Sequence, residues 1–537
     1  MKKKRIIKGM LLAGMTISLS AAILITPSSI LGQSPTVVEA AQTAEVTSLD
    51  QFKSALLNSN VTEINVTKSF SFKGDIHNIP NRDLVINGNA DKGVVITSGI
   101  NSIYGKQNYN STNLLSIKNA KIAGDAAVGR FFTGGAGNGP SSRGWDVYAE
   151  GVTYTGARFI HLSEGKLTFG GTNTINTRAE NAWVHSLEFL PNSIYNGVAA
   201  NKDHGQFSAF YFNGRLVNGK AVGTVKIGAD AQVTVKIGPQ SNVNYYYPVF
   251  YDKVYKVDID ENATLDVDAA GVAFQFIPRA DYLGDIPEER YKSPVLNLAK
   301  NSKAYFNGRG GGNYATMKLQ YYGSRVNVNE GAELVVTGKS KKGVVESEYK
   351  GATFNLTAPG NFEITNKEPG NKLFYSTNTT INATDLSEIN YWNQLGGDYN
   401  VNPTGTFGEN NLFNVNFGKL CNSQTLSVNA TDTATKGNFR MENYGKISLK
   451  GKSNVVPPNP IWNDYRVAIE AGQIVIDYIQ ADRLELYVDG DLAKIINISY
   501  EEILSSIMVS YPGLSPRAVI EVKGFYQGEE VGYGRWN

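Results

Sequence analysis

The middle of the chain repeats one pattern of hydrophobic and polar positions. In each copy two hydrophobic residues alternate with polar ones, four turn residues follow, and two more hydrophobic residues resume the alternation. Alternation with a period of two is typical of a strand that buries one face. The first hydrophobic position of successive copies holds Val225, Val257, Leu296, Val326 and Phe354. The pattern therefore predicts a strand–turn–strand unit that recurs along the chain.

The spacing of the copies indicates that these units stack. Their first hydrophobic positions lie 32, 39, 30 and 28 residues apart, so insertions fall between copies and not inside them. The fourth turn position is always small and holds Ala231, Ala263, Ser302, Ala332, Gly360 and Gly445. The hydrophobic positions of a sixth copy are Phe439, Met441, Ile447 and Leu449. Stacked coils tolerate such loops, so we expect an all-β parallel β-helix; tandem β-sandwich domains are the rival architecture.

Both ends of the repeat carry features of their own. Residues 48–58 begin with a capping box, Ser48 to Gln51, and predict a short amphipathic helix that covers the open end of the β-helix. The β-helix domain is expected over 41–453, followed by a proline-rich linker at 454–460. Short strands with hairpin signals in 461–537 predict a small immunoglobulin-like β-sandwich.

The first forty residues predict a signal peptide. A basic start precedes an apolar run that ends near Ile25, and Val38-Glu39-Ala40 is a small-x-small cleavage site. Residues 41–537 hold 46 basic and 48 acidic side chains, a balance that argues against nucleic acid or an anionic membrane as partner. Cys421 is the only cysteine, so no internal disulfide can form. We expect a secreted protein without integral membrane contact.

These features together resemble a known family. The signal, the helix that leads into Val61–Val66, and the segment 84–89 are similar to the pectate-lyase-like adhesive domain of Gram-positive surface proteins. The resemblance covers about residues 45–450, and the tail resembles a bacterial Ig-like domain. It implies a right-handed β-helix and a secreted or wall-associated adhesin. Many members carry a C-terminal sorting signal, which this sequence lacks.

Acidic residues on the outward face were the first candidates for chemistry, because β-helix lyases use calcium-binding acids on neighbouring coils. The best cluster is Asp258, Asp260, Asp266 and Asp268. The residues that match Asp258 in the other copies are Lys226, Asn297, Asn327 and Asn355. Because Lys226 and Lys236 precede Asp258 and Asp268 by one copy, we expect ion pairs between these residues. The sequence requires no cofactor, and calcium at the four aspartates is the alternative.

No group of residues matches a catalytic spacing. Histidines lie near acids at His161 and Glu164, at His185 and Glu188, and at His204, but these pairs lack the spacing of a metal site or a triad. A glycosidase would need two carboxylates from different coils, which spacing alone does not reveal. The sequence therefore predicts no catalytic residue.

Aromatic residues in or beside the insertions are the candidate binding surface. They are Tyr245, Tyr246, Tyr247, Tyr321, Tyr322, Tyr391 and Trp392. Aromatic rings stack on sugars and anchor protein interfaces, although single tyrosines also fill the core of a wide solenoid. We expect an adhesin that binds a polysaccharide or a host or cell-wall component without catalysis. A polysaccharide lyase or glycoside hydrolase is the alternative, and a structural spacer is the third reading.

Overall fold

The computed structural model divides the chain into two compact units, Met1–Lys452 and Ser453–Asn537. The described residues are 17–18, 42–134, 143–200, 207–212, 223–238, 246–276, 294–320, 323–347, 351–393, 399, 402–420, 423–452, 463–470, 473–477, 483–497, 507–512, 514–515, 518–526 and 529–536. Among them, no helix is long and apolar enough to cross a membrane. The expected signal peptide and linker lie almost entirely outside these residues.

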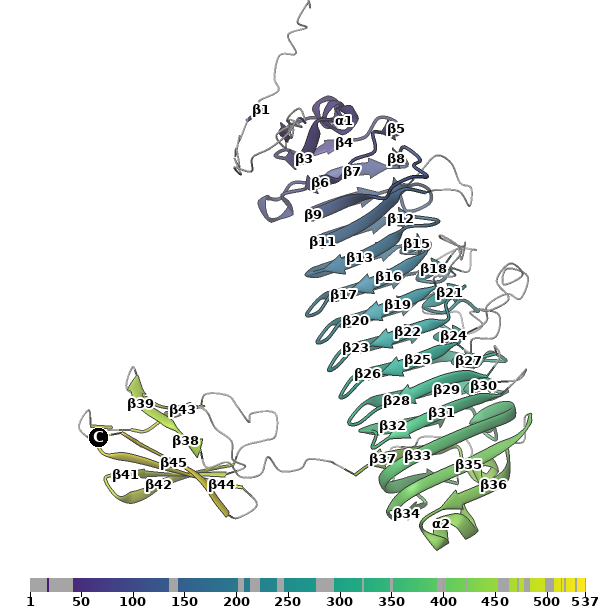
Figure 1. Ribbon diagram of the computed structural model, residues 1–537, viewed down its shortest axis with the longest axis vertical. Helices are drawn as coiled ribbons and strands as arrows, with labels where there is room; N and C mark the ends of the chain where they lie inside the picture. The colour runs from purple at the N-terminus through teal and green to yellow at the C-terminus, as the bar shows by residue number, and fades with distance from the viewer. Residues whose placement is uncertain are drawn as a thin grey trace, which may run out of the picture. The chain divides into compact units, whose positions relative to one another are not determined.

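The first unit is a stack of short strands that pair in parallel along three ladders (Figure 1). The first ladder contains β2 (Gln42–Val46), β3 (Val61–Val66), β6 (Leu84–Asn87), β9 (Asn113–Gly124), β11 (Trp145–Gly156), β13 (Lys166–Gly170), β16 (Ser186–Phe189), β19 (Thr224–Ile227), β22 (Lys256–Ile259), β25 (Val295–Leu298), β28 (Ser324–Val328), β31 (Ala352–Thr357) and β33 (Phe374–Trp392). We call the stretch of chain that contributes one strand to each ladder a rung.

The second ladder follows the first across a tight corner. Besides the second halves of β9 and β11, it contains β4 (Phe70–Ser71), β7 (Ile96–Gly99), β14 (Thr172–Thr177), β17 (Ile194–Ala199), β20 (Gln232–Ile237), β23 (Thr264–Ala269), β26 (Lys303–Gly312), β29 (Glu333–Ser340) and β32 (Asn361–Asn366).

The third ladder lies beside the insertions between the repeats. It contains β5 (Ile76–Ile79), β8 (Ile103–Gly105), β10 (Arg130–Thr133), β12 (Arg158–His161), β15 (Ala182–Val184), β18 (Phe210–Phe212), β21 (Phe250–Asp252), β24 (Phe274–Phe276), β27 (Met317–Leu319), β30 (Val345–Ser347) and the start of β33. The backbone N–H of Val249 donates to Ala273 O at 3.0 Å and joins the rungs of β21 and β24.

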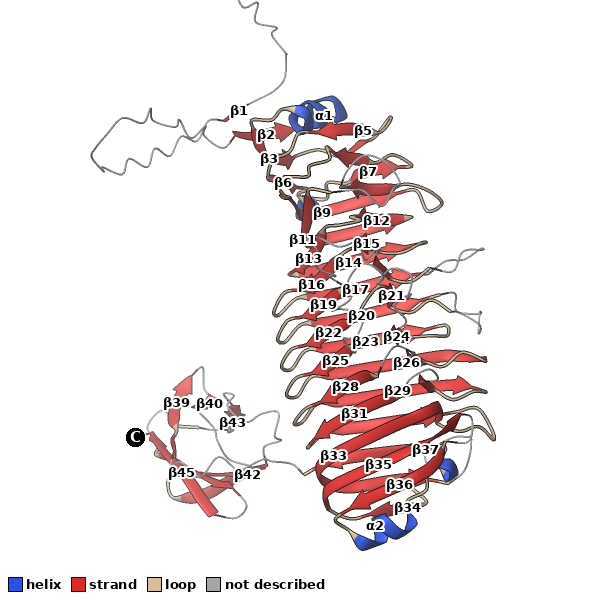
Figure 2. Ribbon diagram, turned by 45° about the vertical axis from the view of Figure 1, so that its right-hand side comes forward, coloured by secondary structure: helices blue, strands red, loops and turns tan. Residues whose placement is uncertain are grey.

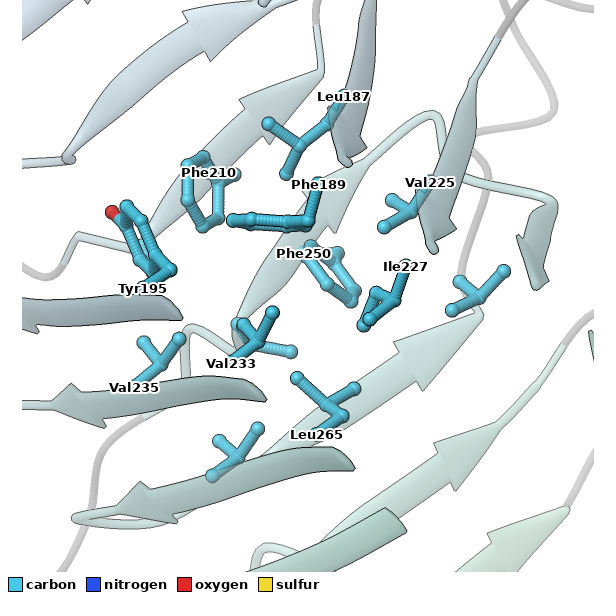
Figure 3. Close-up of a cluster of buried hydrophobic side chains, with 14 of the residues drawn as sticks. Leu187, Phe189, Tyr195, Phe210, Val225, Ile227, Val233, Val235, Phe250 and Leu265 are labelled. Atoms are coloured by element: carbon cyan, nitrogen blue, oxygen red, sulfur yellow. The ribbon is translucent and has the colours of Figure 1, made fainter. Parts of the chain in front are cut away.

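The predicted repeat has the predicted register. Val225 pairs with Val257, Val257 with Leu296, and the alignment continues to Val326 and Phe354. All of these side chains are at least 99% buried. Figure 3 shows how residues from successive rungs, among them Val225, Val233 and Leu265, gather in one apolar core. The first five copies are therefore confirmed.

The corners explain why the fourth turn position is small. Ala231, Ala263, Ser302 and Ala332 are all fully buried there. The residue before them is left-handed, with φ of 60° at Asp230, 57° at Asn262, 56° at Asn301 and 67° at Gly331. Asparagine, aspartate and glycine are the residues that best tolerate this backbone region. Each of these four corners is thus one left-handed residue followed by one that fits without a large side chain.

The prediction of a sixth copy is wrong. Phe439 ends the helix α2 (Thr433–Asn438), and Met441 begins the 3-10 helix η3 (Met441–Asn443), so neither lies in a strand. Ile447 and Leu449 do lie in a strand, β37 (Lys446–Gly451), but it runs antiparallel to β32 and β33. The buried hydrophobic residues of this closing segment have the same spacing as the repeat, although they belong to a different structure.

Both ends of the stack are closed, as Figure 2 shows. At the N-terminal end, the predicted helix is α1 (Leu49–Leu57), capped by the Ser48 hydroxyl, with Phe52, Ala55 and Leu56 buried. At the other end, the antiparallel strands β34 (Gly405–Phe407), β35 (Asn410–Leu420), β36 (Gln424–Ala430) and β37 extend β33, and α2 follows. Two short elements, β1 (Ile17–Ser18) and η1 (Ala90–Lys92), complete this unit.

The second unit contains two small sheets. One has the strand order β38 (Asn463–Asp464), β45 (Glu529–Trp536), β44 (Ile520–Tyr526), β41 (Arg483–Val488) and β42 (Asp491–Asn497). The other has β39 (Arg466–Glu470), β40 (Gln473–Asp477) and β43 (Ile507–Ser510). Ile474, Ile476, Leu484, Leu486 and Ile520 are buried in their own hydrophobic core. Two sheets around one core are the arrangement of a β-sandwich.

The outward asparagines of the repeat form a ladder of side-chain hydrogen bonds. Asn297 Nδ2 donates to Asp258 Oδ1 at 2.8 Å, Asn327 to Asn297 at 2.7 Å, Asn355 to Asn327 at 2.9 Å and Asn382 to Asn355 at 3.1 Å. Each carboxamide donates to the preceding rung and accepts from the following one. Such aligned hydrogen bonds strengthen one another.

We expect Asn327→Ala to lower the free energy of unfolding by about 1–2 kcal/mol, because it interrupts this ladder at two hydrogen bonds on a half-buried face. Urea unfolding measures the change. Val335→Ala on the neighbouring strand β29 is the control, since Val335 is also half-buried and outward but carries no hydrogen bond. Equal losses in the two variants would show that the ladder adds nothing beyond side-chain packing.

Candidate functional site

One side of the stack carries a row of aromatic residues. In β15, β18 and β21 the middle residue is half-buried, whereas the residue before it lies in the core. These middle residues are Trp183, Tyr211 and Tyr251, and the register of the third ladder aligns them directly. His161 occupies the matching position one rung earlier. Because strand side chains alternate between faces, all four lie on the outward side of this ladder.

The rings of this row are in contact from rung to rung. Their centroids are 4.5 Å apart for His161 and Trp183, 4.8 Å for Trp183 and Tyr211, and 5.8 Å for Tyr211 and Tyr251. Tyr247 packs against Tyr251 at 4.7 Å. We call His161, Trp183, Tyr211, Tyr251 and Tyr247 the aromatic row. Contacts at these distances make a continuous row of rings along the stack, in which His161 is buried and the tyrosines and Trp183 are half-buried.

Two more tyrosines extend the row over a buried ion pair. The Tyr246 ring lies 5.6 Å from both Tyr247 and Tyr314. Lys318 Nζ lies 4.8 Å from the Tyr246 centroid and 3.6 Å from Glu346 Oε2, and both charged side chains are less than a tenth exposed. Lysine over an aromatic face gains a cation–π attraction that strengthens as water is excluded.

The other end of the row carries arginines. The guanidinium of Arg158 lies 4.6 Å above the Trp183 ring and 2.5 Å from Glu180 Oε2, and Glu180 is 7% exposed. Arg130 pairs with Arg158 one rung earlier, and its Nη1 lies 2.7 Å from His161 Nδ1. The arginines therefore fix both the tryptophan and the histidine in place.

His161 is held in its neutral form. Burial, with the positive charges of Arg130 and Arg158 next in importance, lowers the pKa of this imidazole to about 3. A neutral ring can accept a hydrogen bond from Arg130 at Nδ1, whereas an imidazolium cannot.

This depressed pKa makes stability depend on pH. Between the usual pKa of about 6.5 and the folded value of about 3, the unfolded chain binds a proton that the folded chain does not. The contribution is therefore complete above pH 6.5 and declines as the pH falls toward 3. We expect the free energy of unfolding to fall by roughly 2 kcal/mol between pH 6.5 and 5 because of this group. Urea unfolding across this range should show a shallower decline for His161→Gln than for the wild type; identical slopes would contradict the assignment.

The predicted tyrosine surface is brought together only in part. Tyr246 and Tyr247 join the aromatic row, whereas Tyr245, Tyr321 and Tyr322 lie outside the described residues. Tyr391 and Trp392 belong to the closing end of the stack. The Tyr391 ring packs on Phe407 and Tyr444 at 5.0 and 4.9 Å, and Trp392 is only 8% exposed, with Lys446 Nζ 4.7 Å from its ring.

The four aspartates lie in one rung: Asp258 on β22, Asp260 directly after it, and Asp266 and Asp268 on β23. Asp258 pairs with Lys256 at 2.6 Å, Asp260 with Lys226 at 3.5 Å, and Asp268 with Arg309 at 3.0 Å. Burial, followed by repulsion from Asp268, raises the pKa of Asp266. Among the described residues, no group of three or more His, Cys, Asp or Glu side chains could hold a metal ion.

The predicted pairing of Lys226 with Asp258 and of Lys236 with Asp268 is wrong, because both aspartates pair with other cations. The register does align Lys226 with Asp258 and Lys236 with Asp268. Lys226 nevertheless reaches past Asp258 to Asp260, because Lys256, two residues along the same strand, lies closer to Asp258. Arg309 from the following rung likewise pairs with Asp268.

Sequence reasoning missed the residues at the centre of the row. Trp183 is an isolated aromatic residue in the sequence, whereas Tyr211 and Tyr251 adjoin phenylalanines that fill the core and were not considered as a surface. A signal was present: each is an aromatic residue that directly follows a buried hydrophobic residue in a three-residue segment before the next repeat. The repeat itself also extends one rung earlier than predicted, with Leu187, Phe189 and Tyr195 in register with Val225, Ile227 and Val233.

Comparison with known proteins agrees with the resemblance. Residues 43–161 match the family model described as "Putative pectate lyase-like adhesive domain". The chain is therefore similar to this adhesive-domain family over that segment. The matched segment includes His161 and ends before the other members of the aromatic row. No curated protein matches the chain significantly.

Two solved structures are similar to the chain. The SRRP of L. reuteri 100-23 is 14% identical and has a TM-score of 0.42, and the match covers 58% of this chain and 92% of that one. The SRRP of L. reuteri 53608 is also 14% identical, with a TM-score of 0.29 and coverage of 58% and 98%.

Proposed function

We propose that the protein is a secreted, adhesin-like surface protein that binds a glycan, or another host or cell-wall component, along the aromatic row without catalysis. In this proposal a signal peptide at 1–40 directs export, and 41–453 forms a right-handed parallel β-helix. A linker at 454–460 joins it to an Ig-like module at 461–537. The adhesive-domain match over residues 43–161 supports the adhesin class.

The continuous contact of the rings is the observation that carries the binding proposal. Three half-buried aromatic side chains, Trp183, Tyr211 and Tyr251, follow one another on three successive rungs, and the buried ring of His161 packs against the first of them. A row of half-buried rings gives a long ligand several stacking positions, which suits a polymer better than a small molecule. Large aromatics held rigidly by neighbours are also the usual anchors of binding energy.

The carboxylates next to the row support binding without turnover. Glu180 is paired with Arg158, and Glu346 with Lys318. Asp252 Oδ2 accepts a hydrogen bond from the Tyr211 hydroxyl at 2.9 Å. A general acid or base must exchange protons with a substrate, and Glu180 and Glu346 are held by ion pairs with cations of the protein.

A glycan array combined with a degradation screen tests the proposal. The purified protein is applied to immobilised polysaccharides, with and without calcium, while release of reducing or unsaturated ends is followed. We expect retention on at least one glycan and no product release. Calcium-dependent product release would replace the proposal with a lyase, and release of reducing ends alone would indicate a hydrolase.

A further inference from the structure

Two cations beside the aromatic row are paired with carboxylates of the protein. Arg158 lies 2.5 Å from Glu180 at one end, and Lys318 lies 3.6 Å from Glu346 at the other. Three of these four side chains are less than a tenth exposed, so the pairs are shielded from water and salt. An anionic ligand would gain little from a cation that already holds a carboxylate, and displacing that carboxylate would leave it buried and unpaired.

Several neutral polar atoms of the row lack a partner. Trp183 Nε1, Thr133 Oγ1 and Gln275 Oε1 are buried without a hydrogen-bond partner among the described residues. All three lie on outward positions of the third ladder. Thr133 precedes His161 by one rung, and Gln275 follows on β24. Buried polar atoms almost always have partners, so three on one ladder indicate that something else completes their hydrogen bonding.

These atoms define the chemistry of that missing partner. An indole N–H donates, a carboxamide oxygen accepts, and a threonine hydroxyl does both. Hydroxyl groups satisfy all three kinds, and a sugar presents hydroxyl groups around an apolar ring face that stacks on aromatics. The atoms are covered in this arrangement, so a ligand that reaches them has to displace the side chains above the row.

We infer that the ligand of the aromatic row is an uncharged, hydroxyl-rich glycan and not a polyuronate. This inference rests on the proposed function and specifies its substrate class. Stacking is supplied by the rings, and hydrogen bonds are supplied by Trp183, Thr133 and Gln275. The ion pairs Arg158–Glu180 and Lys318–Glu346 hold two cations beside the row to carboxylates of the protein.

Binding is tested with neutral and acidic probes across a range of NaCl concentrations. The neutral probes are mannan, galactan and xylan, and the acidic probes are polygalacturonate and alginate. We expect the wild type to bind a neutral probe with an affinity that salt changes less than twofold, because no counterions are released. Glu180→Gln uncouples Arg158, so this variant should gain salt-sensitive binding to polygalacturonate.

Trp183→Phe tests the hydrogen bond proposed for Trp183 Nε1 and leaves Glu180 unchanged. It keeps an aromatic face and removes the Nε1 donor, so affinity for the neutral probe should fall about fivefold. Unchanged affinity in this variant would overturn the assigned role of Nε1. Salt-sensitive binding of the wild type to polygalacturonate, lost in Arg158→Gln, would overturn the inference while leaving the adhesin proposal intact. Binding to none of the five probes and to no glycan on the array would overturn both.

Discussion

Phe189→Ala should destabilise the first unit by about 3–5 kcal/mol, the largest loss of stability that we expect from a single side chain. Phe189 is fully buried on β16 and contacts aromatic rings from three other strands. Its ring lies 5.4 Å from Phe169. It also lies 5.1 Å from Tyr195 and 6.1 Å from Phe210, two residues that Figure 3 shows beside it. These three strands belong to all three ladders, so a cavity at Phe189 weakens each of them at the same level.

Urea unfolding followed by tryptophan fluorescence measures this loss. Glu188→Ala is the matched control, because Glu188 is the preceding residue of the same strand and points outward to Lys166. A partly exposed ion pair contributes about 1 kcal/mol at most, so the control should unfold near the wild-type midpoint. Equal effects of the two substitutions would mean that β16 does not bury alternate residues as described.

Trp183→Ala should weaken ligand binding by about 30-fold or more, the largest effect on function that we expect. Trp183 is the centre of the aromatic row, between His161 and Tyr211, and Arg158 covers its ring. Removal of such an anchor commonly costs at least about 2 kcal/mol of binding free energy. Titration calorimetry with the glycan identified on the array measures the change.

Tyr305→Ala is the matched control for this substitution. Tyr305 is also a half-buried outward aromatic residue, but it lies on β26 of the second ladder, where its hydroxyl donates to Glu333 at 2.7 Å. Its loss should leave affinity within about twofold of the wild type. An equal loss in both variants, or no loss in Trp183→Ala when its thermal unfolding is unchanged, would remove the aromatic row from the binding account.

The repeat could be predicted from the sequence because two physical constraints act on it together. Alternation with a period of two identifies strands with one buried face, and a conserved turn length fixes their register. Residues such as Val257 and Leu265 obey both constraints, and their pairing is as expected. The N-terminal helix was equally visible, because a capping box and an apolar face define it locally.

The closing end and the aromatic row could not be predicted in the same way. Phe439 and Met441 copy the spacing of the template, but their conformation depends on how the chain folds over the last rung. Trp183, Tyr211 and Tyr251 are separated by loops of unequal length, so only the stacking of rungs brings them together. Clusters in the sequence favoured tyrosine pairs instead, and one such pair, Tyr391 and Trp392, belongs to the closing end.

Hydroxyl-radical footprinting with and without bound glycan tests the central claim most directly, because it reports which aromatic side chains the ligand covers. We predict protection of Trp183, Tyr211 and Tyr251, with Tyr305 unchanged as the reference on another ladder. Protection of Tyr305, or of residues 463–536 alone, with Trp183 and Tyr211 unaffected, would contradict the account and place the binding surface elsewhere on the protein.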